Sequence, residues 1–201
     1  MPVGVDSATS ATLAQPAATA VQVRRYQLNV LDGHSSTVTG TLRTAAHTPL
    51  ARREIVLQAY KGHRWRTVAR SRTRGNGRYT LSFTPQRLGS QVLRVRFPGD
   101  PFDLPVLRRI GRLTVYRLAG ASWYGGAGMT ACGGALTSST LGVANKTLPC
   151  GTLVTLHYGD RTVRVPVIDR GPYVAGRDFD LTEATKAALG FGDTGEVWST
   201  R

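Results

Sequence analysis

The sequence predicts an all-β protein with two domains, and three observations support this. Short segments that alternate apolar and polar residues recur over residues 23–116, with turn residues between them and no helical periodicity. The later part of the chain is again mostly β-type, with one convincing helix over residues 182–189. The charge also changes abruptly between the two parts. We therefore expect a β-sandwich followed by a second β-domain that carries one short helix.

Charge divides the 201-residue chain. Residues 21–118 hold 19 Lys and Arg against 4 Asp and Glu, whereas residues 119–201 hold 7 of each kind. Residues 1–20 are rich in Ala, Thr and Ser and lack the basic start and apolar core of a signal peptide, so we expect a disordered N-terminal segment. Residues 117–120 are expected to be a short connector. The positive field of the first domain favours polyanionic partners such as anionic wall polymers, and nothing indicates specific nucleic-acid recognition.

The basic domain contains a regular series of strand-like segments. They are residues 27–31, 37–43, 54–60, 65–70, 79–83, 91–97 and 112–116. Their number and spacing predict a β-sandwich. Val38–Leu42, Gly62–Trp65, Gly77–Tyr79 and the Phe97–Asp100 turn also resemble bacterial immunoglobulin-like modules. That resemblance implies a spacer or adhesion domain and assigns no catalytic residue.

The neutral domain has its own strand and helix signals. Residues 153–158 and 161–168 are expected to pair as a hairpin across Gly159-Asp160. Thr182 is a suitable N-cap for the helix, which should end at Gly190.

Two carboxylates stand out in the neutral domain. A β-type run ending at Val167 leads to Asp169 in a Gly-Pro turn, and Asp180 follows eleven residues later, just before the helix. Two carboxylates at the ends of neighbouring elements suit acid/base cleavage of a polysaccharide. The structural alternatives are that Asp169 only binds turn amides and that Asp180 only caps the helix. Asp178, between them, is expected to be exposed.

The chain has two cysteines, Cys132 and Cys150. Their nearness in a Gly-rich domain favours a disulfide over two buried thiols, and a disulfide indicates an oxidising, extracytoplasmic compartment. No Cys-x-x-Cys or His-rich spacing accompanies them, so neither a metal site nor a cofactor is expected. No segment is apolar enough to span a membrane.

Five motifs in the neutral domain occur in a fixed order. They are Ala121–Gly125, Thr130–Gly134, Gly142–Thr152, Val167–Tyr173 and Gly176–Thr182. Together they resemble the six-stranded double-psi β-barrel of the rare lipoprotein A (RlpA) family, to which the barrels of expansins, some endoglucanases and membrane-bound lytic transglycosylases are related. The resemblance implies an envelope protein that acts on peptidoglycan glycan strands. In active members the reaction is lytic transglycosylation, which breaks the bond between N-acetylmuramic acid and N-acetylglucosamine without water and leaves a 1,6-anhydro end.

This chain departs from the family pattern at two positions. Active members typically carry a Glu where this sequence has Gly134 and a His where it has Asn145. Asp169 is retained. Asp180 matches the essential or general-acid carboxylate of the expansins and endoglucanases, so the resemblance implies catalytic roles for both aspartates.

The residue types around the two aspartates suggest a set of substrate-binding residues. Trp123 and Tyr124 can stack on a sugar ring, although an aromatic pair in a β-run is often part of a core. Asn145 can hydrogen-bond a sugar but cannot transfer a proton. Arg170 either pairs with Asp169 or faces away, and Tyr173 can supply an apolar wall beside the carboxylates.

Three functions remain open from the sequence. The first is a secreted lytic transglycosylase that uses Asp169 and Asp180. The second is a non-catalytic, expansin-like protein that binds peptidoglycan or another polysaccharide, which the loss of the Glu and the His favours. The third is a polyanion-binding module in which the basic sandwich dominates. Whether the barrel is an enzyme is therefore left open by the sequence.

Overall fold

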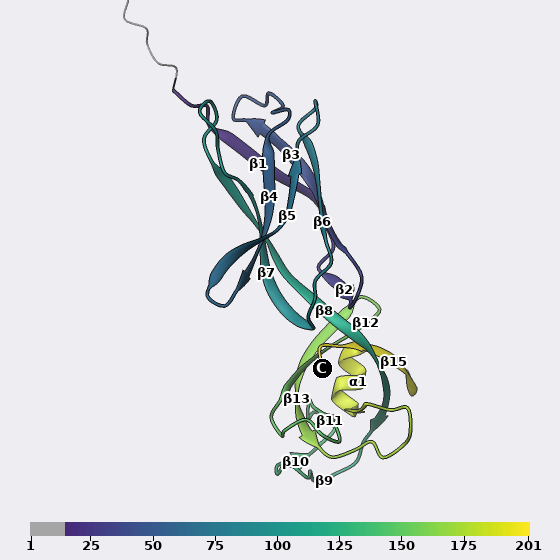
Figure 1. Cartoon of the computed structure of the whole chain (residues 1–201). Helices are drawn as coiled ribbons and strands as arrows, with labels where there is room; N and C mark the ends of the chain where they lie inside the picture. Colours follow the sequence, from purple (N-terminus) through teal and green to yellow (C-terminus); the bar gives the residue numbers. More distant parts are fainter. Residues whose placement is uncertain (1–14) are drawn as a thin grey trace, which may run out of the picture.

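The computed structural model describes residues 15–201, and these residues form a β-sandwich and a β-barrel joined end to end (Figure 1). Strand β8 (Val106–Tyr124) runs from one into the other and belongs to both. The described residues contain one helix, α1 (Glu183–Leu189). The all-β fold class with one short helix is therefore confirmed.

The sandwich consists of two sheets that enclose one apolar core. Its strands are β1 (Thr19–Tyr26), β2 (Asn29–Leu31), β3 (Ser36–Thr44), β4 (Glu54–Lys61), β5 (Arg64–Arg72), β6 (Arg78–Phe83) and β7 (Gly89–Phe97), with the first part of β8. One sheet has the order β1-β3-β6, and the other has the order β5-β4-β7-β8 with β2 beside β8. Alternate residues such as Ile55, Leu57 and Ala59 on β4 point inward and are almost fully buried. The immunoglobulin-like character of this sandwich stays a prediction.

Two boundary predictions differ from the structure. Residues 1–14 lie outside the described part, but Thr19 and Ala20, expected to be disordered, belong to β1 and pair with β3. Residues 117–120 are not a connector, because they continue β8 and pair with β15 (Thr194–Ser199). The alternation of small and apolar residues around Gly120 permits a strand there, whereas the change of charge between residues 118 and 119 had suggested a boundary.

The barrel is a closed ring of six strands. Its members are the second part of β8, β11 (Val143–Ala144), β12 (Leu153–Tyr158), β13 (Arg161–Asp169), β14 (Phe179–Thr182) and β15. They pair in the order β8-β15-β12-β13-β11-β14, and the pairing of β14 with β8 closes the ring. A small separate ribbon, β9 (Gly128–Met129) with β10 (Ala135–Leu136), projects from it. Closure leaves the ring without open edges and positions side chains at fixed cross-strand registers.

Helix α1 lies where the sequence predicted it, with the predicted N-cap and C-terminal glycine. The Thr182 hydroxyl accepts a hydrogen bond from the Thr185 N–H at its start. Gly190, with φ of 64°, ends it in the left-handed conformation that glycine adopts most easily. The Leu189 side chain is buried in the barrel core.

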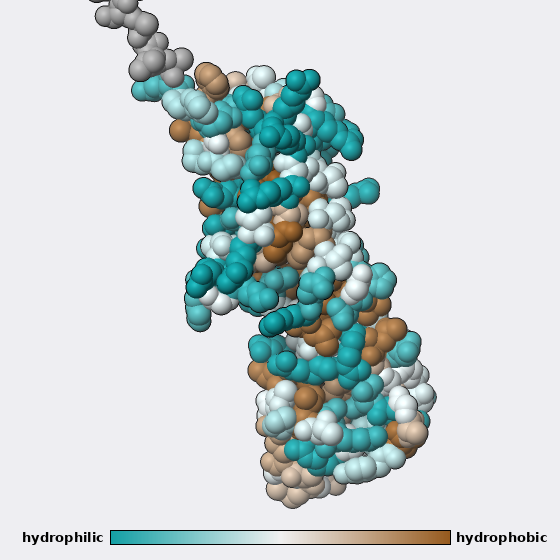
Figure 2. Space-filling model, in the orientation of Figure 1, coloured by the Kyte–Doolittle hydropathy of each residue, from teal (hydrophilic) through white to brown (hydrophobic). Residues whose placement is uncertain are grey.

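An aromatic cluster lies where the sandwich meets the barrel. The rings of Tyr116 on β8, His157 on β12 and Trp198 on β15 lie with centroids 5.2 to 5.9 Å apart. Figure 2 shows hydrophobic residues gathered near this junction, whereas hydrophilic residues cover much of the same face of the sandwich. Shared backbone and packed rings therefore hold the two parts together.

Candidate functional site

Asp169 and Asp180 are brought together by the register of four neighbouring strands. Asp180 on β14 lies opposite Ser122 on β8 and, on its other side, opposite Ala144 on β11. Ala144 in turn lies opposite Asp169 on β13. The two aspartates therefore stand two strand spacings apart, about 10 Å between Cα atoms, with Ala144 opposite both of them on the intervening strand.

A bulge in β13 sets the direction of Asp169. The register between β11 and β13 shifts after Val143, which pairs with Val167, so that Ala144 pairs with Asp169 and Ile168 is the extra residue. Val143 and Val167 face the core and are almost fully buried, whereas Asp169 and Asp180 are half-buried. Residues directly opposite each other share a face of the sheet, so both carboxylates lie on the outward face.

The two carboxylates have different hydrogen-bond partners. Asp169 Oδ1 accepts bonds from the backbone N–H groups of Ala131 at 2.9 Å and Arg170 at 2.8 Å. Asp180 Oδ1 accepts a hydrogen bond from the hydroxyl of Ser122, which is buried. A backbone N–H can only donate, so Asp169 Oδ1 is fixed as an acceptor. A hydroxyl can donate or accept, so the Ser122 contact suits Asp180 with or without a proton.

Tyr124 places a third polar group near both aspartates. It lies two residues after Ser122 on β8 and so shares its face. Burial raises the pKa of the Tyr124 hydroxyl well above its usual 10.0, and the charges of Asp169 and then Asp180 raise it further. The hydroxyl oxygen is buried and, within residues 15–201, has no partner in hydrogen-bonding geometry, although Asp169 is near enough to affect its pKa. Tyr124 is therefore a neutral donor beside both carboxylates.

Trp123 does not join this group. It alternates with Ser122 and Tyr124 along β8 and so points to the other side of the strand. The Lys186 ammonium on α1 lies 3.8 Å from the centre of its ring, and its indole N–H donates to Asp193 Oδ1 at 2.9 Å. Lys186 and Asp193 also form an ion pair at 2.8 Å. The structure thus uses Trp123 to pack α1 against the barrel, although the ring remains 38% exposed.

Asn145 and Arg170 hold a loop rather than face the carboxylates. Asn145 is buried, accepts bonds from the N–H groups of Thr147 and Leu148, and donates to the carbonyl of Asp178. Its side chain has little capacity left for a sugar. The Arg170 guanidinium donates to the carbonyls of Asn145 and Leu148 and to Cys150 Sγ, so it faces away from the Asp169 carboxylate.

The remaining predicted positions divide into accessible and structural ones. Tyr173 is 81% exposed and free to meet a ligand. Gly134 is exposed and has φ of 102°, with open space where a side chain would project. Asp178, expected to be exposed, is half-buried and bonded, because it pairs with Arg117 at 3.0 Å and accepts the Gly120 N–H.

The disulfide supports the Asp169 side of the site. Cys132 and Cys150 are bonded, as the sequence predicted. The bond ties the loop that contains Ala131 to the loop that Asn145 and Arg170 hold. It therefore helps to keep the Ala131 N–H on the Asp169 carboxylate. Within the described chain, no group of three His, Cys, Asp or Glu side chains is placed to hold a metal ion.

Sequence reasoning missed Ser122 and Ala131. Ser122 lies 58 residues from Asp180 along the chain, and only the parallel pairing of β14 with β8 brings them together. Ala131 contributes its backbone, which carries no side-chain signal. For Ser122 the usable signal was the alternation along residues 121–124, which places Ser122 and Tyr124 on one face and Trp123 on the other.

Comparison with known proteins confirms the resemblance of the C-terminal part. Residues 118–198 match the family model described as lytic transglycolase. A probable endolytic peptidoglycan transglycosylase RlpA of Aquifex aeolicus (strain VF5) is 43% identical over 75 residues, which are 35% of this chain and 33% of that protein. The protein of the same name from Synechocystis sp. (strain ATCC 27184 / PCC 6803 / Kazusa) is 37% identical over 89 residues, 41% of this chain and 28% of that protein.

Each of these matches covers less than half of this chain. The chain spans about a third of the length of the curated relatives that it matches. Among solved structures, the Streptomyces papain inhibitor is 28% identical and covers 43% of this chain and 94% of its own, with a TM-score of 0.35. Within residues 15–201, no helix has the length and apolar character needed to cross a membrane.

Proposed function

We propose that the RlpA-like double-psi β-barrel of residues 118–198 binds peptidoglycan glycan strands and cleaves them by lytic transglycosylation. The observation that carries this proposal is the shared register of Ser122, Asp180, Ala144 and Asp169, which puts two carboxylates on one outward face. The RlpA names of the relatives support the choice of peptidoglycan. The disulfide supports an extracytoplasmic place of action at the cell wall.

In this proposal Asp180 is the acid and base. It donates a proton to the glycosidic oxygen as the bond from that oxygen to C1 of the muramyl residue breaks. The same carboxylate then accepts the proton of the C6 hydroxyl as O6 bonds to C1, so no water is consumed. The Ser122 hydroxyl can follow this proton by reversing its hydrogen bond, which no backbone N–H can do.

Asp169 has a supporting role. Its Oδ1 is occupied by two backbone N–H groups, and its Oδ2 has no hydrogen-bond partner among residues 15–201. A fixed carboxylate beside the reacting sugar stabilises the positive charge that develops at C1. The raised pKa of Tyr124, whose hydroxyl lies near both aspartates, keeps that side chain neutral, so it adds no third negative charge to the site.

The test is digestion of purified glycan strands by the wild type, Asp169→Asn and Asp180→Asn. Mass spectrometry of the products should show 1,6-anhydro-muramyl ends with the wild type and a loss of at least a hundredfold in their rate of formation with Asp180→Asn. Asp160→Asn, an exposed aspartate in the β12–β13 turn, is the matched control and should behave as wild type. Equal rates for all four proteins would overturn the assignment.

A second candidate function is non-catalytic glycan binding. The observation that favours it is the occupation of Asn145 by loop hydrogen bonds and the absence of a carboxylate at Gly134. In that case wild type and both aspartate variants release no product, and the variants lose affinity for the strands.

The basic sandwich offers a means of retention at an anionic wall. One outward face of the β5-β4-β7-β8 sheet, which we call the arginine face, carries Arg94, Arg96 and Arg109 beside Trp65. The Arg94 guanidinium lies 4.0 Å from the centre of the Trp65 ring and donates to Gln58 at 2.8 Å. Burial lowers the pKa of Arg94, and the charges of Arg96 and Arg109 lower it further, so these cations crowd one another. An anionic wall polymer would relieve this repulsion.

A further inference from the structure

A cleft lies between the sandwich and the barrel, and none of the candidate-site residues lines it. Its volume is about 500 Å³. The sandwich contributes residues of β7 and β8, and the barrel part contributes residues of β12 and β13 together with residues 200–201. A ligand in this interdomain cleft would therefore touch both parts of the molecule.

The lining of the interdomain cleft is cationic and rich in hydroxyls. Arg112 belongs to the sandwich part of β8, and Arg164 belongs to β13 of the barrel. Neither guanidinium has an ion-pair or hydrogen-bond partner among residues 15–201, and no Asp or Glu side chain lines the cleft. Five Ser and Thr residues complete the polar lining. Guanidinium groups donate and hydroxyls donate or accept, so an anion in the cleft would meet hydrogen-bond donors from both parts.

The arginine face continues along β7 and β8 into this cleft. Arg94 pairs with Arg109, and two residues away along β7, Val92 pairs with Arg112. Alternate residues of a strand share a face, as do residues directly opposite each other, so Arg112 lies on the same face as Arg94. A row of cations therefore leads from the sandwich sheet to the barrel side of the cleft. We call this row the cationic track, and its members are Arg96, Arg94, Arg109, Arg112 and Arg164.

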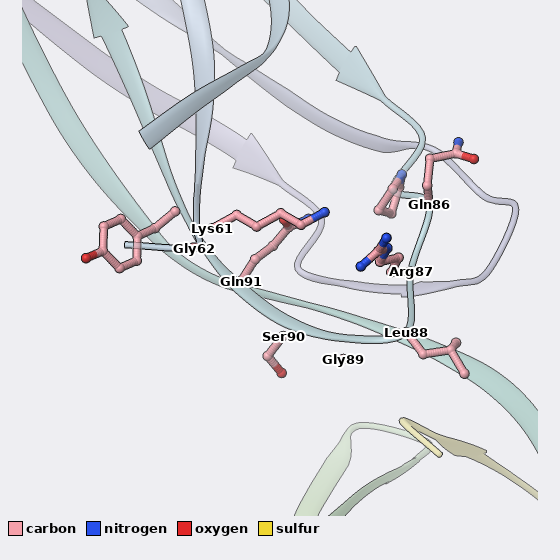
Figure 3. Close-up of a pocket in the computed structure, with 10 residues that line it drawn as sticks. Lys61, Gly62, Gln86, Arg87, Leu88, Gly89, Ser90 and Gln91 are labelled. Atoms are coloured by element: carbon pink, nitrogen blue, oxygen red, sulfur yellow. The ribbon is translucent and has the colours of Figure 1, made fainter. Parts of the chain in front are cut away.

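A second hollow adjoins the interdomain cleft and is also cationic. It has a volume of about 330 Å³ and shares Gly89 and Ser90 with the cleft. Figure 3 shows the Lys61 and Arg87 side chains directed toward one another across it. No Asp or Glu side chain lines this hollow either. Two cations that converge without a counter-charge repel each other unless an anion lies between them.

We infer that the cationic track binds a polymer whose units are joined by phosphodiesters and carry no bases, with one phosphate held in the cleft between Arg112 and Arg164. A phosphodiester backbone carries its charges at regular intervals, which matches a row of cations. Each phosphate keeps two free oxygens for donors while the chain continues on both sides of it. This inference goes beyond the proposed function, because it names the chemistry of the retained wall polymer and requires no glycan cleavage. It also makes retention depend on a residue of the barrel, although residues 119–201 hold equal numbers of cations and anions.

The lining favours a polymer without bases over a nucleic acid. Proteins that bind single-stranded nucleic acid place aromatic rings along a positive groove so that bases stack on them. The interdomain cleft has no aromatic side chain in its lining. Trp65, beside the arginine face, already holds the Arg94 guanidinium against its ring. Bases would therefore gain no stacking partner in the cleft, and contacts to phosphate would supply the affinity.

The experiment measures the binding of three labelled, soluble probes of equal length by the full chain at several salt concentrations. The probes are an abasic oligodeoxyribonucleotide, which is a phosphodiester chain without bases, the matching oligothymidylate, and oligoglutamate, which carries carboxylates instead. The variants are Arg112→Gln and Arg164→Gln. Their controls are Arg108→Gln and Arg161→Gln, which remove exposed arginines from the same two strands outside the cleft. No probe contains a glycan strand, so the result does not depend on cleavage by the barrel.

The wild type should bind the abasic probe as tightly as oligothymidylate and more tightly than oligoglutamate. Each cleft variant should reduce the slope of log affinity against log salt by about 0.7, the value for one lost contact with a single-stranded phosphodiester chain. Both controls should keep the slope of the wild type.

Four results would overturn the inference. Equal changes in variants and controls would show that only net charge matters, and an effect of Arg112→Gln without one of Arg164→Gln would remove the barrel from the site. Tighter binding of oligothymidylate would indicate a nucleic-acid surface, and equal binding of oligoglutamate would remove the preference for phosphodiesters. If the wild type binds no probe and still cleaves glycan strands, this inference fails while the proposed cleavage stands.

Discussion

Ser122 and Asp180 lie opposite each other on the parallel strands β8 and β14, and the Ser122 hydroxyl donates a hydrogen bond to the Asp180 carboxylate. The sandwich and the barrel share β8, so the strand that supplies Ser122 is also the strand that joins the two parts. Ser122 is buried and bonded to Asp180, so we expect its effect on chemistry to act through Asp180.

Ser122→Ala tests this dependence. We expect the rate of glycan cleavage to fall by about ten- to a hundredfold, because a hydrogen bond to a charged group contributes about 1.5 to 3 kcal/mol and each 1.4 kcal/mol is about a factor of ten. In the double variant Ser122→Ala/Asp180→Asn, the rate should be no lower than in Asp180→Asn alone. The asparagine cannot transfer a proton, so positioning it no longer affects the rate. The cleavage rates of the wild type, the two single variants and the double variant test this. Additive losses of activation free energy would show that Ser122 acts independently of Asp180.

Tyr124→Phe tests the unpartnered hydroxyl. Removing a buried hydroxyl that makes no hydrogen bond should leave the free energy of unfolding unchanged or raise it by about 1 kcal/mol. Tyr79→Phe is the matched control, because its buried hydroxyl donates to the Gln22 carbonyl at 2.9 Å and its removal should cost about 1 kcal/mol. Denaturant unfolding of both variants provides the values. A larger loss for Tyr124→Phe than for Tyr79→Phe would contradict this account.

Opening the disulfide should weaken both the fold and the site. The bond joins residues 18 apart, and closing a loop of that size stabilises by about 3 kcal/mol in the chain-entropy model. The Cys132→Ser/Cys150→Ser variant should unfold at a lower temperature and cleave glycan more slowly, because Ala131 is less well held against Asp169. Thermal unfolding with and without reductant checks this: reductant should lower the midpoint of the wild type and leave that of the variant unchanged.

The aromatic cluster should make stability depend on pH. Burial lowers the pKa of His157 from its usual 6.5, with smaller opposing effects from Arg161 and Asp160. The folded protein therefore favours neutral His157, and the stability that this residue contributes is present above pH 6.5 and is lost as the pH falls through the lowered value. Unfolding free energies measured between pH 7.5 and 5 should fall less steeply for His157→Gln than for the wild type. If unfolding free energy depends on pH equally in the wild type and in His157→Gln, then His157 does not cause the pH dependence.

The arginine face should make wall binding sensitive to salt. Each cation that contacts a polyanion releases counterions, so the slope of log affinity against log salt reports the number of such contacts. Arg94→Gln/Arg109→Gln should reduce this slope by about 1.5 with an anionic wall polymer, at about 0.7 to 0.9 for each lost contact. Arg24→Gln/Arg25→Gln should change it little. An identical change in both variants would show that only net charge matters.

Much of the fold could be predicted from local sequence patterns. The β12–β13 hairpin, the capped helix α1 and most sandwich strands each have a signal within a few residues, such as Gly159-Asp160 or Thr182 with Gly190. The connector expected at residues 117–120 was wrong because a change in charge marks a boundary in composition only, whereas the pairing of β8 with β15 continues the strand across it. Strand pairing over long separations overrides such signals.

In the candidate site, too, local sequence signals identified some residues, and others follow only from long-range strand pairing. Asp169 and Asp180 were found from the sequence because each ends a recognisable element. Their common neighbour Ala144 and the donor Ser122 follow only from the closed ring of strands. Trp123 and Asn145 were expected at the substrate, yet Lys186 covers one and three loop hydrogen bonds occupy the other. Residue type identified groups that can bind sugar, and only the tertiary structure shows which of them have other partners.

Digestion of peptide-bearing glycan strands by the wild-type protein in heavy-oxygen water tests the central claim most directly. Mass spectrometry separates two products: an anhydro end, which contains no oxygen from the solvent, and a reducing end, which contains one. The account predicts anhydro-muramyl ends without heavy oxygen, because Asp180 passes the proton between two groups of the same sugar chain. Reducing ends that carry heavy oxygen, or strands that remain intact after prolonged incubation, would contradict it.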